Sequence, residues 1–235
     1  MKPEDISENS RIARRMLDIQ PFHVMALLAR ARELEAQGRS IIHMEIGEPD
    51  FPSPQPVIAA GIRALQQGNI HYTPALGLPQ LREAIAACYL KRYGLRISPA
   101  RIIVTPGASG ALLLALGILI NPGEKVLMSD PGYPCNRHFV RLIESLPIGI
   151  GTDTATGYQL TPELIAKHWD AKTAAVMIAS PANPTGTLVG QENLRAIVEK
   201  VQALGGRLIA DEIYHGLVYQ GEAATALSVS DEVFV

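Results

Sequence analysis

Two short polar segments near the end of the chain carry side chains that suit a flat nitrogen heterocycle. Asp211 directly follows the apolar run 207–210, Tyr214 comes three residues later, and Asn183 lies in a Pro-rich turn after the run 174–179. A carboxylate pairs with a protonated ring nitrogen, and amide and phenol groups hydrogen-bond to a ring oxygen. Asp211 could instead cap a helix or bind magnesium, but the magnesium alternative lacks an accompanying phosphate loop.

The segment Thr105-Pro-Gly-Ala-Ser-Gly110 follows an expected strand and begins an expected helix. Its small residues would let backbone N–H groups approach an anion at the positive end of the helix, and phosphate is the expected ligand. A turn that needs glycine only for its geometry is the alternative. The segment is neither a Walker loop nor a dinucleotide fingerprint, and Ser109, flanked by Ala108 and Gly110, does not stand in the Gly-x-Ser-x-Gly elbow of hydrolases.

One tyrosine is a further candidate for binding a heterocycle, whereas the cysteines and histidines are not. Tyr133, in Asp130-Pro-Gly-Tyr-Pro134, could stack on a heterocycle or simply pack within a turn. Cys88 and Cys135 are the only cysteines, and neither has metal-ligand spacing or an evident disulfide partner. We interpret both as reduced thiols and Cys135 as a small buried filler. The histidines lack the spacing of zinc ligands, so no metal site is predicted.

Alternation of short branched apolar runs with helical stretches predicts an α/β body built on a parallel sheet. The expected strands are 101–105, 125–129, 145–150, 174–179 and 207–210, with 233–235 opening another. The expected helices between them are 108–120, 133–144, 162–168 and 191–204. Before this body, the pattern predicts an arm and helix over 11–37, a strand at 41–46, a loop at 47–54 and a helix at 56–67.

Composition excludes several classes of protein. The chain is 47% hydrophobic and 19% charged, with a formal net charge of −2, so neither disorder nor a basic surface for nucleic acid is expected. No apolar run reaches the length of a membrane-spanning helix, and the polar N-terminus lacks a secretory signal. These features predict a cytoplasmic protein with neither nucleic-acid nor membrane partners.

Together, the motifs resemble the class I/II aminotransferases of fold type I. The segments that carry the resemblance are Gly47-Glu-Pro-Asp-Phe51, Tyr72-Thr-Pro-Ala-Leu-Gly-Leu-Pro-Gln-Leu-Arg82, Thr105-Pro-Gly-Ala-Ser-Gly110, Asp130-Pro-Gly-Tyr133, Ser180-Pro-Ala-Asn-Pro-Thr-Gly186 and Ala210-Asp-Glu-Ile-Tyr214. The resemblance implies a three-layer α/β large domain with a mostly parallel sheet at 51–235, incomplete at its C-terminus. It also implies an arm and part of a small domain at 1–50, and pyridoxal 5′-phosphate as cofactor.

The resemblance also assigns cofactor-binding roles to individual residues. Ala108 and Ser109 would bind the cofactor phosphate, and Tyr133 would stack on the pyridine ring. Asp211 would pair with the ring nitrogen, which favours the protonated ring that stabilises a carbanion at the substrate α-carbon.

Other roles concern the ring oxygen, the substrate and a second subunit. Asn183 and Tyr214 would hydrogen-bond to the ring oxygen, and Asn183 would also contact the carboxylate of the amino acid or 2-oxo acid substrate. Gly47 would line the substrate pocket. Tyr72 would cross the interface of a homodimer toward the neighbouring site.

The family pattern is incomplete, because no lysine follows Lys200 to form the Schiff base with the cofactor. The resemblance also implies a phosphate-binding arginine and a small-domain arginine for the substrate carboxylate, and this sequence contains neither. No catalytic residue is therefore assigned, and the chain is expected to be the N-terminal portion of an aminotransferase that is inactive alone. The alternatives are a β-eliminating carbon–sulfur lyase on the same scaffold, or a degenerate protein that binds cofactor or dimerises without catalysis. A nucleotide-binding doubly wound domain would explain only the segment 105–110.

Overall fold

The computed structural model describes residues 12–235 and divides the chain into two compact units. The larger unit joins residues 12–20 to Pro79–Val235, and the smaller unit is Pro21–Leu78. The predicted domain boundary near residue 50 stays a prediction.

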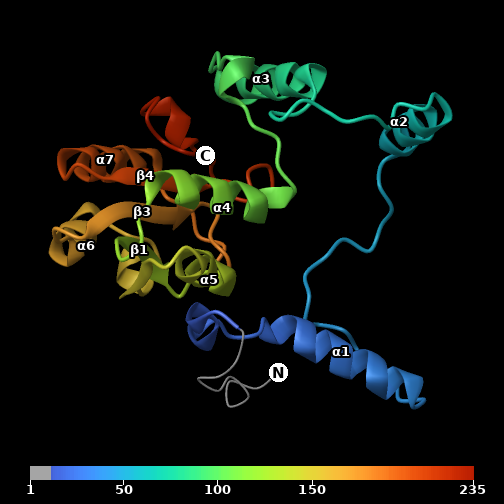
Figure 1. Cartoon of the computed structure of the whole chain (residues 1–235), viewed down its shortest axis with the longest axis horizontal. Helices are drawn as coiled ribbons and strands as arrows, with labels where there is room; N and C mark the ends of the chain where they lie inside the picture. Colours follow the sequence, from blue (N-terminus) through green and yellow to red (C-terminus); the bar gives the residue numbers. More distant parts are fainter. Residues whose placement is uncertain (1–11) are drawn as a thin grey trace. The chain divides into compact units, whose positions relative to one another are not determined.

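A parallel sheet forms the centre of the larger unit (Figure 1). Its four strands follow the order β2-β1-β3-β4. Their bounds are β1 Lys125–Asp130, β2 Leu146–Gly151, β3 Thr173–Ala179 and β4 Arg207–Asp211. In the register of the sheet, Met128 lies opposite Met177, which in turn lies opposite Ile209. Because β1 and β3 are central strands covered on both faces, their apolar residues are consecutive, at 126–128 in β1 and 174–179 in β3.

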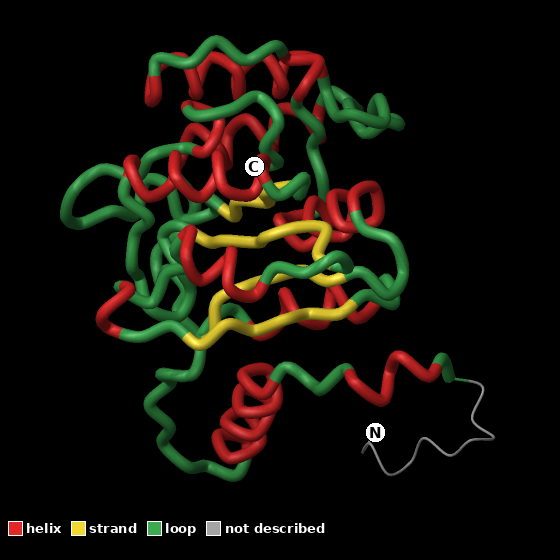
Figure 2. The backbone as a smooth tube through the Cα atoms, turned by 90° about the vertical axis from the view of Figure 1, so that its left-hand side faces the viewer, coloured by secondary structure: helices red, strands yellow, loops and turns green. Residues whose placement is uncertain are grey.

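Helices cover both faces of this sheet, as Figures 1 and 2 show. Helices α4 Gly107–Leu119 and α5 Pro134–Leu142 pack with one core cluster, whose buried members include Leu116, Val126, Val140, Met177 and Ile209. Helices α6 Pro162–His168 and α7 Gln191–Ala203 pack with the other, which includes Leu127, Ile165, Val176, Ile197 and Leu208. Successive strand residues point to opposite faces, so β1, β3 and β4 contribute to both clusters, whereas the edge strand β2 contributes Ile150 to the second one only. The predicted three-layer α/β fold is confirmed.

Shorter elements complete the two units. The larger unit also contains helix α3 Pro79–Tyr93 and the 3-10 turns η2 Arg14–Asp18, η3 Pro99–Arg101, η4 Thr154–Thr156 and η5 Ala226–Ser228. The smaller unit contains helices α1 His23–Ala36 and α2 Gln55–Gln66. No helix within residues 12–235 is long and apolar enough to cross a bilayer.

Two predicted strands are wrong. Residues 102–105 form no strand, although Ile102 has an extended backbone, and residues 41–46 also form none. Ile42 and Met44 are more than four-fifths exposed. A run of apolar residues becomes a strand only when a neighbouring strand accepts its backbone hydrogen bonds. The expected strand at 233–235 is reduced to one isolated bridge, between Ile209 and Phe234.

Candidate cofactor site

The carboxyl ends of three neighbouring strands bring the candidate polar residues to one edge of the sheet. Asp211 is the last residue of β4, Tyr133 follows β1, and Asn183 follows β3. Because the strands are parallel, the loops that follow them meet at the same edge, where open α/β sheets bind ligands. The peptide bonds preceding Pro131, Pro181 and Pro184 in these loops are cis.

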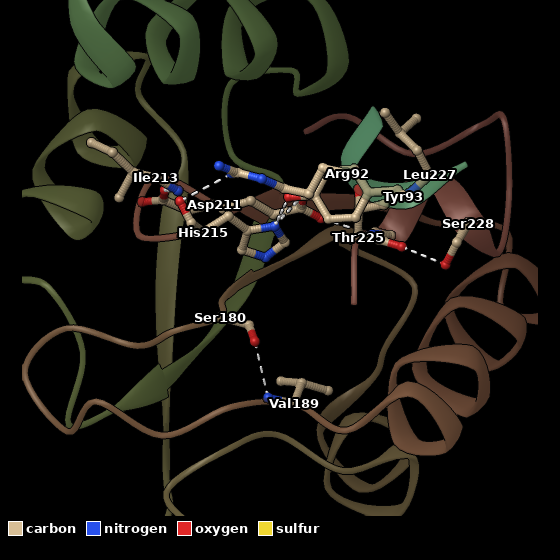
Figure 3. A network of polar contacts seen from close by, with 12 residues as sticks. Arg92, Tyr93, Ser180, Val189, Asp211, Ile213, His215, Thr225, Leu227 and Ser228 are labelled. Carbon is tan, nitrogen blue, oxygen red and sulfur yellow. Dashed lines mark hydrogen bonds and ion pairs between the residues drawn. The ribbon is translucent and has the colours of Figure 1, made fainter. Parts of the chain in front are cut away.

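Asp211 has a half-buried carboxylate at this edge. Its Oδ1 accepts a hydrogen bond of 3.1 Å from the backbone N–H of Ile213 (Figure 3). Burial raises the pKa of the carboxyl group, and the Ile213 N–H partly opposes that rise. No cationic side chain within residues 12–235 pairs with Asp211. A desolvated carboxylate of this kind favours a positively charged ligand group.

Asn183 and Tyr214 come together from two different loops. The Asn183 side-chain amide donates a hydrogen bond of 3.4 Å to the Tyr214 hydroxyl. Because Asp211 and Tyr214 lie three residues apart, this bond brings Asn183 close to the segment that carries the carboxylate. An amide N–H and a phenol O–H can both donate to one ligand oxygen.

Tyr133 lies within electrostatic range of the same residues. A hydrogen bond to the Cys135 thiol and burial together raise the pKa of Tyr133 to about 12, with smaller contributions from Tyr214 and Asp211. The phenol is therefore neutral near pH 7 and offers an apolar aromatic face. Cys135, expected to be a buried filler, is only half-buried.

A pocket opens beside these groups at the carboxyl ends of β1 and β3. Tyr133 and Asn183 line it together with Gly132, Ala182 and Asn136. The Asn136 side chain is buried, and its Oδ1 has no hydrogen-bond partner among residues 12–235. Sequence reasoning missed Asn136, because one asparagine at the start of a helix carries no signal of burial. A buried acceptor without a partner is suited to a ligand with a hydrogen-bond donor.

The expected phosphate turn forms the start of α4. Gly107 has φ +73°, a conformation that favours glycine, and no side chain caps the helix. The first turn, which contains Ala108 and Ser109, therefore offers backbone N–H groups at the positive end of the helix dipole. No hydrogen bond within residues 12–235 connects Ala108 or Ser109 to Asp211, so their common role stays a prediction.

Two predicted site residues belong to the smaller unit. Gly47 and Tyr72 are both exposed there, and Tyr72 is fully so. Their predicted roles at the substrate pocket and across a dimer interface stay predictions.

Sequence reasoning also missed a buried ionisable pair next to Asp211. Glu212 and His215 have side chains that are only 8% and 5% exposed, and Tyr93 of α3 contacts His215. The only sequence signal was that a glutamate and a histidine lie three residues apart after an expected strand. Their burial by a distant helix is not visible in the local sequence.

Comparison with known proteins gives this edge of the sheet its context. The family model described as aminotransferase class I and II matches residues 39–235. The chain belongs to this family. Members of the class I and II aminotransferases use pyridoxal phosphate, and the unpaired Asp211 and the Asn183–Tyr214 pair fit its pyridine ring and ring oxygen.

Individual aminotransferases show how far the similarity extends. The (5-formylfuran-3-yl)methyl phosphate transaminase of Methanocaldococcus jannaschii is 36% identical over 94% of this chain and 57% of its own length. The valine–pyruvate aminotransferase of Mycobacterium tuberculosis is 39% identical over 88% of this chain and 53% of its own length. The crystal structure of an aminotransferase from Mycobacterium tuberculosis superposes with a TM-score of 0.90, at 38% identity, over 96% of this chain and 58% of that one.

The chain therefore spans little more than half of the length of these relatives. Neither of the two curated relatives is named as a carbon–sulfur lyase.

Proposed function

We propose that this protein takes part in pyridoxal 5′-phosphate-dependent transfer of an amino group from an amino acid to a 2-oxo acid. The observation that carries the proposal is the half-buried Asp211 carboxylate, which lacks a cation within residues 12–235 and lies beside the Asn183–Tyr214 pair. The transaminase names of the curated relatives support it. When bound, the cofactor supplies an electron sink for carbanion chemistry at the α-carbon of the amino acid.

The residues at the carboxyl edge of the sheet would each hold one part of the cofactor. Asp211 would keep a proton on the ring nitrogen, because its desolvated carboxylate gains most from a cationic partner. Asn183 and Tyr214 would donate to the ring oxygen, and the neutral Tyr133 would pack its aromatic face on the ring.

The phosphate would lie at the start of α4. There Ala108 and Ser109 supply backbone N–H groups, and Ser109 supplies a hydroxyl group.

The substrate and the assembly are further parts of the proposal. Asn183 and Gly47 would contact the amino acid or 2-oxo acid. A homodimer would bring the exposed Tyr72 of one subunit to the site of its partner. A cytoplasmic location is supported by the two cysteines, both of which are free.

The chain is proposed to supply the noncovalent part of the site. Lys125 begins β1 and Lys172 directly precedes β3, so both lie at the edge of the sheet opposite Asp211. Neither is placed to react with a cofactor bound at the carboxyl edge.

Cofactor recognition can be tested with pyridoxamine 5′-phosphate, whose amine does not form imines with surface lysines. Titration of the chain by equilibrium dialysis should show binding at least about tenfold tighter than that of pyridoxamine, because the phosphate interacts with charged or helix-terminal donors. Equal affinities for the two ligands would count against the proposed phosphate site.

Amino transfer itself needs a base, which methylamine can supply in place of a lysine. With methylamine and a 2-oxo acid, the chain should convert pyridoxamine 5′-phosphate to pyridoxal 5′-phosphate, while the 2-oxo acid becomes the amino acid. The Asp211→Asn variant is the matched control. A wild-type rate equal to that of this variant would contradict the proposed function.

A further inference from the structure

A buried polar cluster lies immediately behind the ring-binding residues, and the proposed function leaves it without a role. We define the cluster as Tyr93, Glu212 and His215. Glu212 Oε2 lies 3.4 Å from His215 Nδ1, and both side chains are more than nine-tenths buried. Ionisable side chains are rarely buried this deeply unless they are paired.

One short contact holds the cluster together and a hydrogen bond connects it to another part of the larger unit. The Tyr93 hydroxyl of α3 lies 2.6 Å from His215 Nδ1 (Figure 3). Glu212 Oε1 accepts a hydrogen bond of 2.7 Å from the backbone N–H of Ala226. Within residues 12–235, Glu212 Oε2 and His215 Nε2 have no partner that meets hydrogen-bond geometry.

Burial favours the neutral forms of both titratable groups. It raises the pKa of Glu212 to about 7, whereas hydrogen bonds from Ala226 and Thr225 oppose the rise. It lowers the pKa of His215, and the neighbouring Ser180 backbone opposes that change. If the Tyr93 hydroxyl donates to Nδ1, the proton of the neutral imidazole lies on Nε2.

The groups that surround the pair come from two elements. From α3, Tyr89 and Tyr93 interact electrostatically with Glu212, and Arg92 interacts with His215. Asp211 precedes Glu212 along the chain. Arg92 donates a hydrogen bond of 3.3 Å to the His215 backbone carbonyl, and the Tyr93 ring centroid lies 5.7 Å from that of His215. Side chains of α3 therefore contact the loop after β4 at two points, the backbone carbonyl of His215 and the His215 ring.

That loop carries the residues proposed to bind the ring. Asp211 and Tyr214 alternate with Glu212 and His215 over a few positions, and the His215 N–H donates to the Glu212 carbonyl oxygen at 2.9 Å. A hydrogen bond of 3.0 Å from the Ser180 N–H to the Asp211 carbonyl oxygen links the same loop to the segment that holds Asn183. A shift of Glu212 or His215 would therefore move the groups that face the ligand.

We propose that Tyr93, Glu212 and His215 are positioning residues that hold Asp211 and Tyr214 in register for the pyridine ring of the cofactor. The proposal rests on the proposed function, since the ring is the ligand that these two residues would bind. Residues that orient the ligand-contacting groups of a site contribute to affinity without touching the ligand.

The first test compares two substitutions on α3. Tyr93→Phe removes the hydroxyl that contacts His215 and keeps the ring. Tyr89→Phe is the matched control, because Tyr89 packs against Tyr93 with ring centroids 5.4 Å apart but is not bonded to His215. Loss of one buried hydrogen bond should weaken binding of pyridoxamine 5′-phosphate by about 3- to 10-fold in Tyr93→Phe. The Tyr89→Phe variant should bind like the wild type.

A second variant and a second measurement separate positioning from general stability. Glu212→Gln keeps the shape of the side chain and its bond with Ala226 but cannot ionise. Ligand affinity of the wild type should change with pH near 7, whereas that of Glu212→Gln should be flatter, a difference that lost folding stability alone would not produce. Circular dichroism confirms that each variant folds before its affinity is measured.

NMR of the imidazole tests the cluster without the cofactor. The ring ¹⁵N signals of His215 should report an accepting Nδ1 in the wild type and an altered Nδ1 environment in Tyr93→Phe. If the wild type shows no affinity for pyridoxamine 5′-phosphate but these signals change as expected, the proposed function is wrong, whereas the contact between Tyr93 and His215 is supported. If the wild type binds but Tyr93→Phe and Glu212→Gln match it in affinity and pH profile, the positioning role is overturned.

Discussion

Ionisation of the buried Glu212 should make the folding stability of this protein fall as the pH rises. Its side chain is 8% exposed, and burial raises its pKa from 4.5 to about 7. Below pH 4.5 the carboxyl group is protonated in both the folded and the unfolded protein, so no stability is lost. Between pH 4.5 and about 7 the unfolded chain ionises first, which favours unfolding.

The size of the effect follows from this difference in pKa. Each pH unit corresponds to about 1.4 kcal/mol, so ionisation of Glu212 should remove about 3 kcal/mol from the free energy of unfolding across this window. His215 acts in the opposite direction, because burial lowers its pKa below 6.5. Its stabilising contribution is present above pH 6.5 and is lost as the pH falls through its folded-state pKa.

Urea unfolding followed by circular dichroism can measure this linkage. The wild type and Glu212→Gln should be compared at several pH values from about 4.5 to about 8, with Glu199→Gln, an exposed glutamate on α7, as the matched control. The stability of Glu212→Gln relative to the wild type should rise by about 3 kcal/mol across the window, and the control should run parallel to the wild type. Parallel curves for all three proteins would show that Glu212 does not ionise at a higher pH in the folded protein than in the unfolded one.

Three further outcomes are expected. Ile197→Ala removes a fully buried side chain of α7 and should lower the free energy of unfolding by about 2–5 kcal/mol in urea; a loss below 1 kcal/mol would contradict the packing. Gly206→Ala would place a Cβ 2.2 Å from Trp169 and should cost about 1–3 kcal/mol, whereas Gly190→Ala, with nothing within 4 Å, should change the thermal midpoint little. With pyridoxal 5′-phosphate and substrates but no added amine, the chain should transaminate no faster than the protein-free solution, and a rate typical of aminotransferases would show this expectation to be wrong.

The sheet could be predicted from the sequence because its strands are short and rich in apolar residues with branched side chains. The expected runs that became β1, β3 and β4 have consecutive buried apolar residues, because these strands are covered on both faces, and flanking turns define their ends. The position of Asp211 followed from the same pattern, since a polar residue directly after such a strand must lie at the edge of the sheet.

Tertiary contacts explain what the sequence did not reveal. The run 101–105 has the composition of a strand, but whether a strand forms depends on a hydrogen-bonding neighbour that is distant in sequence. His215 contacts Tyr93, more than one hundred residues earlier in the chain, and Glu212 accepts a hydrogen bond from Ala226, which is also outside the local segment. Local patterns indicate charge and periodicity, but not which distant helix removes a side chain from water.

The ¹⁵N chemical shift of the ring nitrogen in bound pyridoxamine 5′-phosphate reports whether Asp211 pairs with the pyridine nitrogen. A charge-assisted hydrogen bond worth about 1.5–3 kcal/mol should raise the pKa of that nitrogen by about 1 to 2. At an alkaline pH where the free ligand is deprotonated, the wild type should therefore hold a protonated ring, and Asp211→Asn a neutral one. The same ring-nitrogen shift in both proteins would show that Asp211 does not pair with the ring nitrogen.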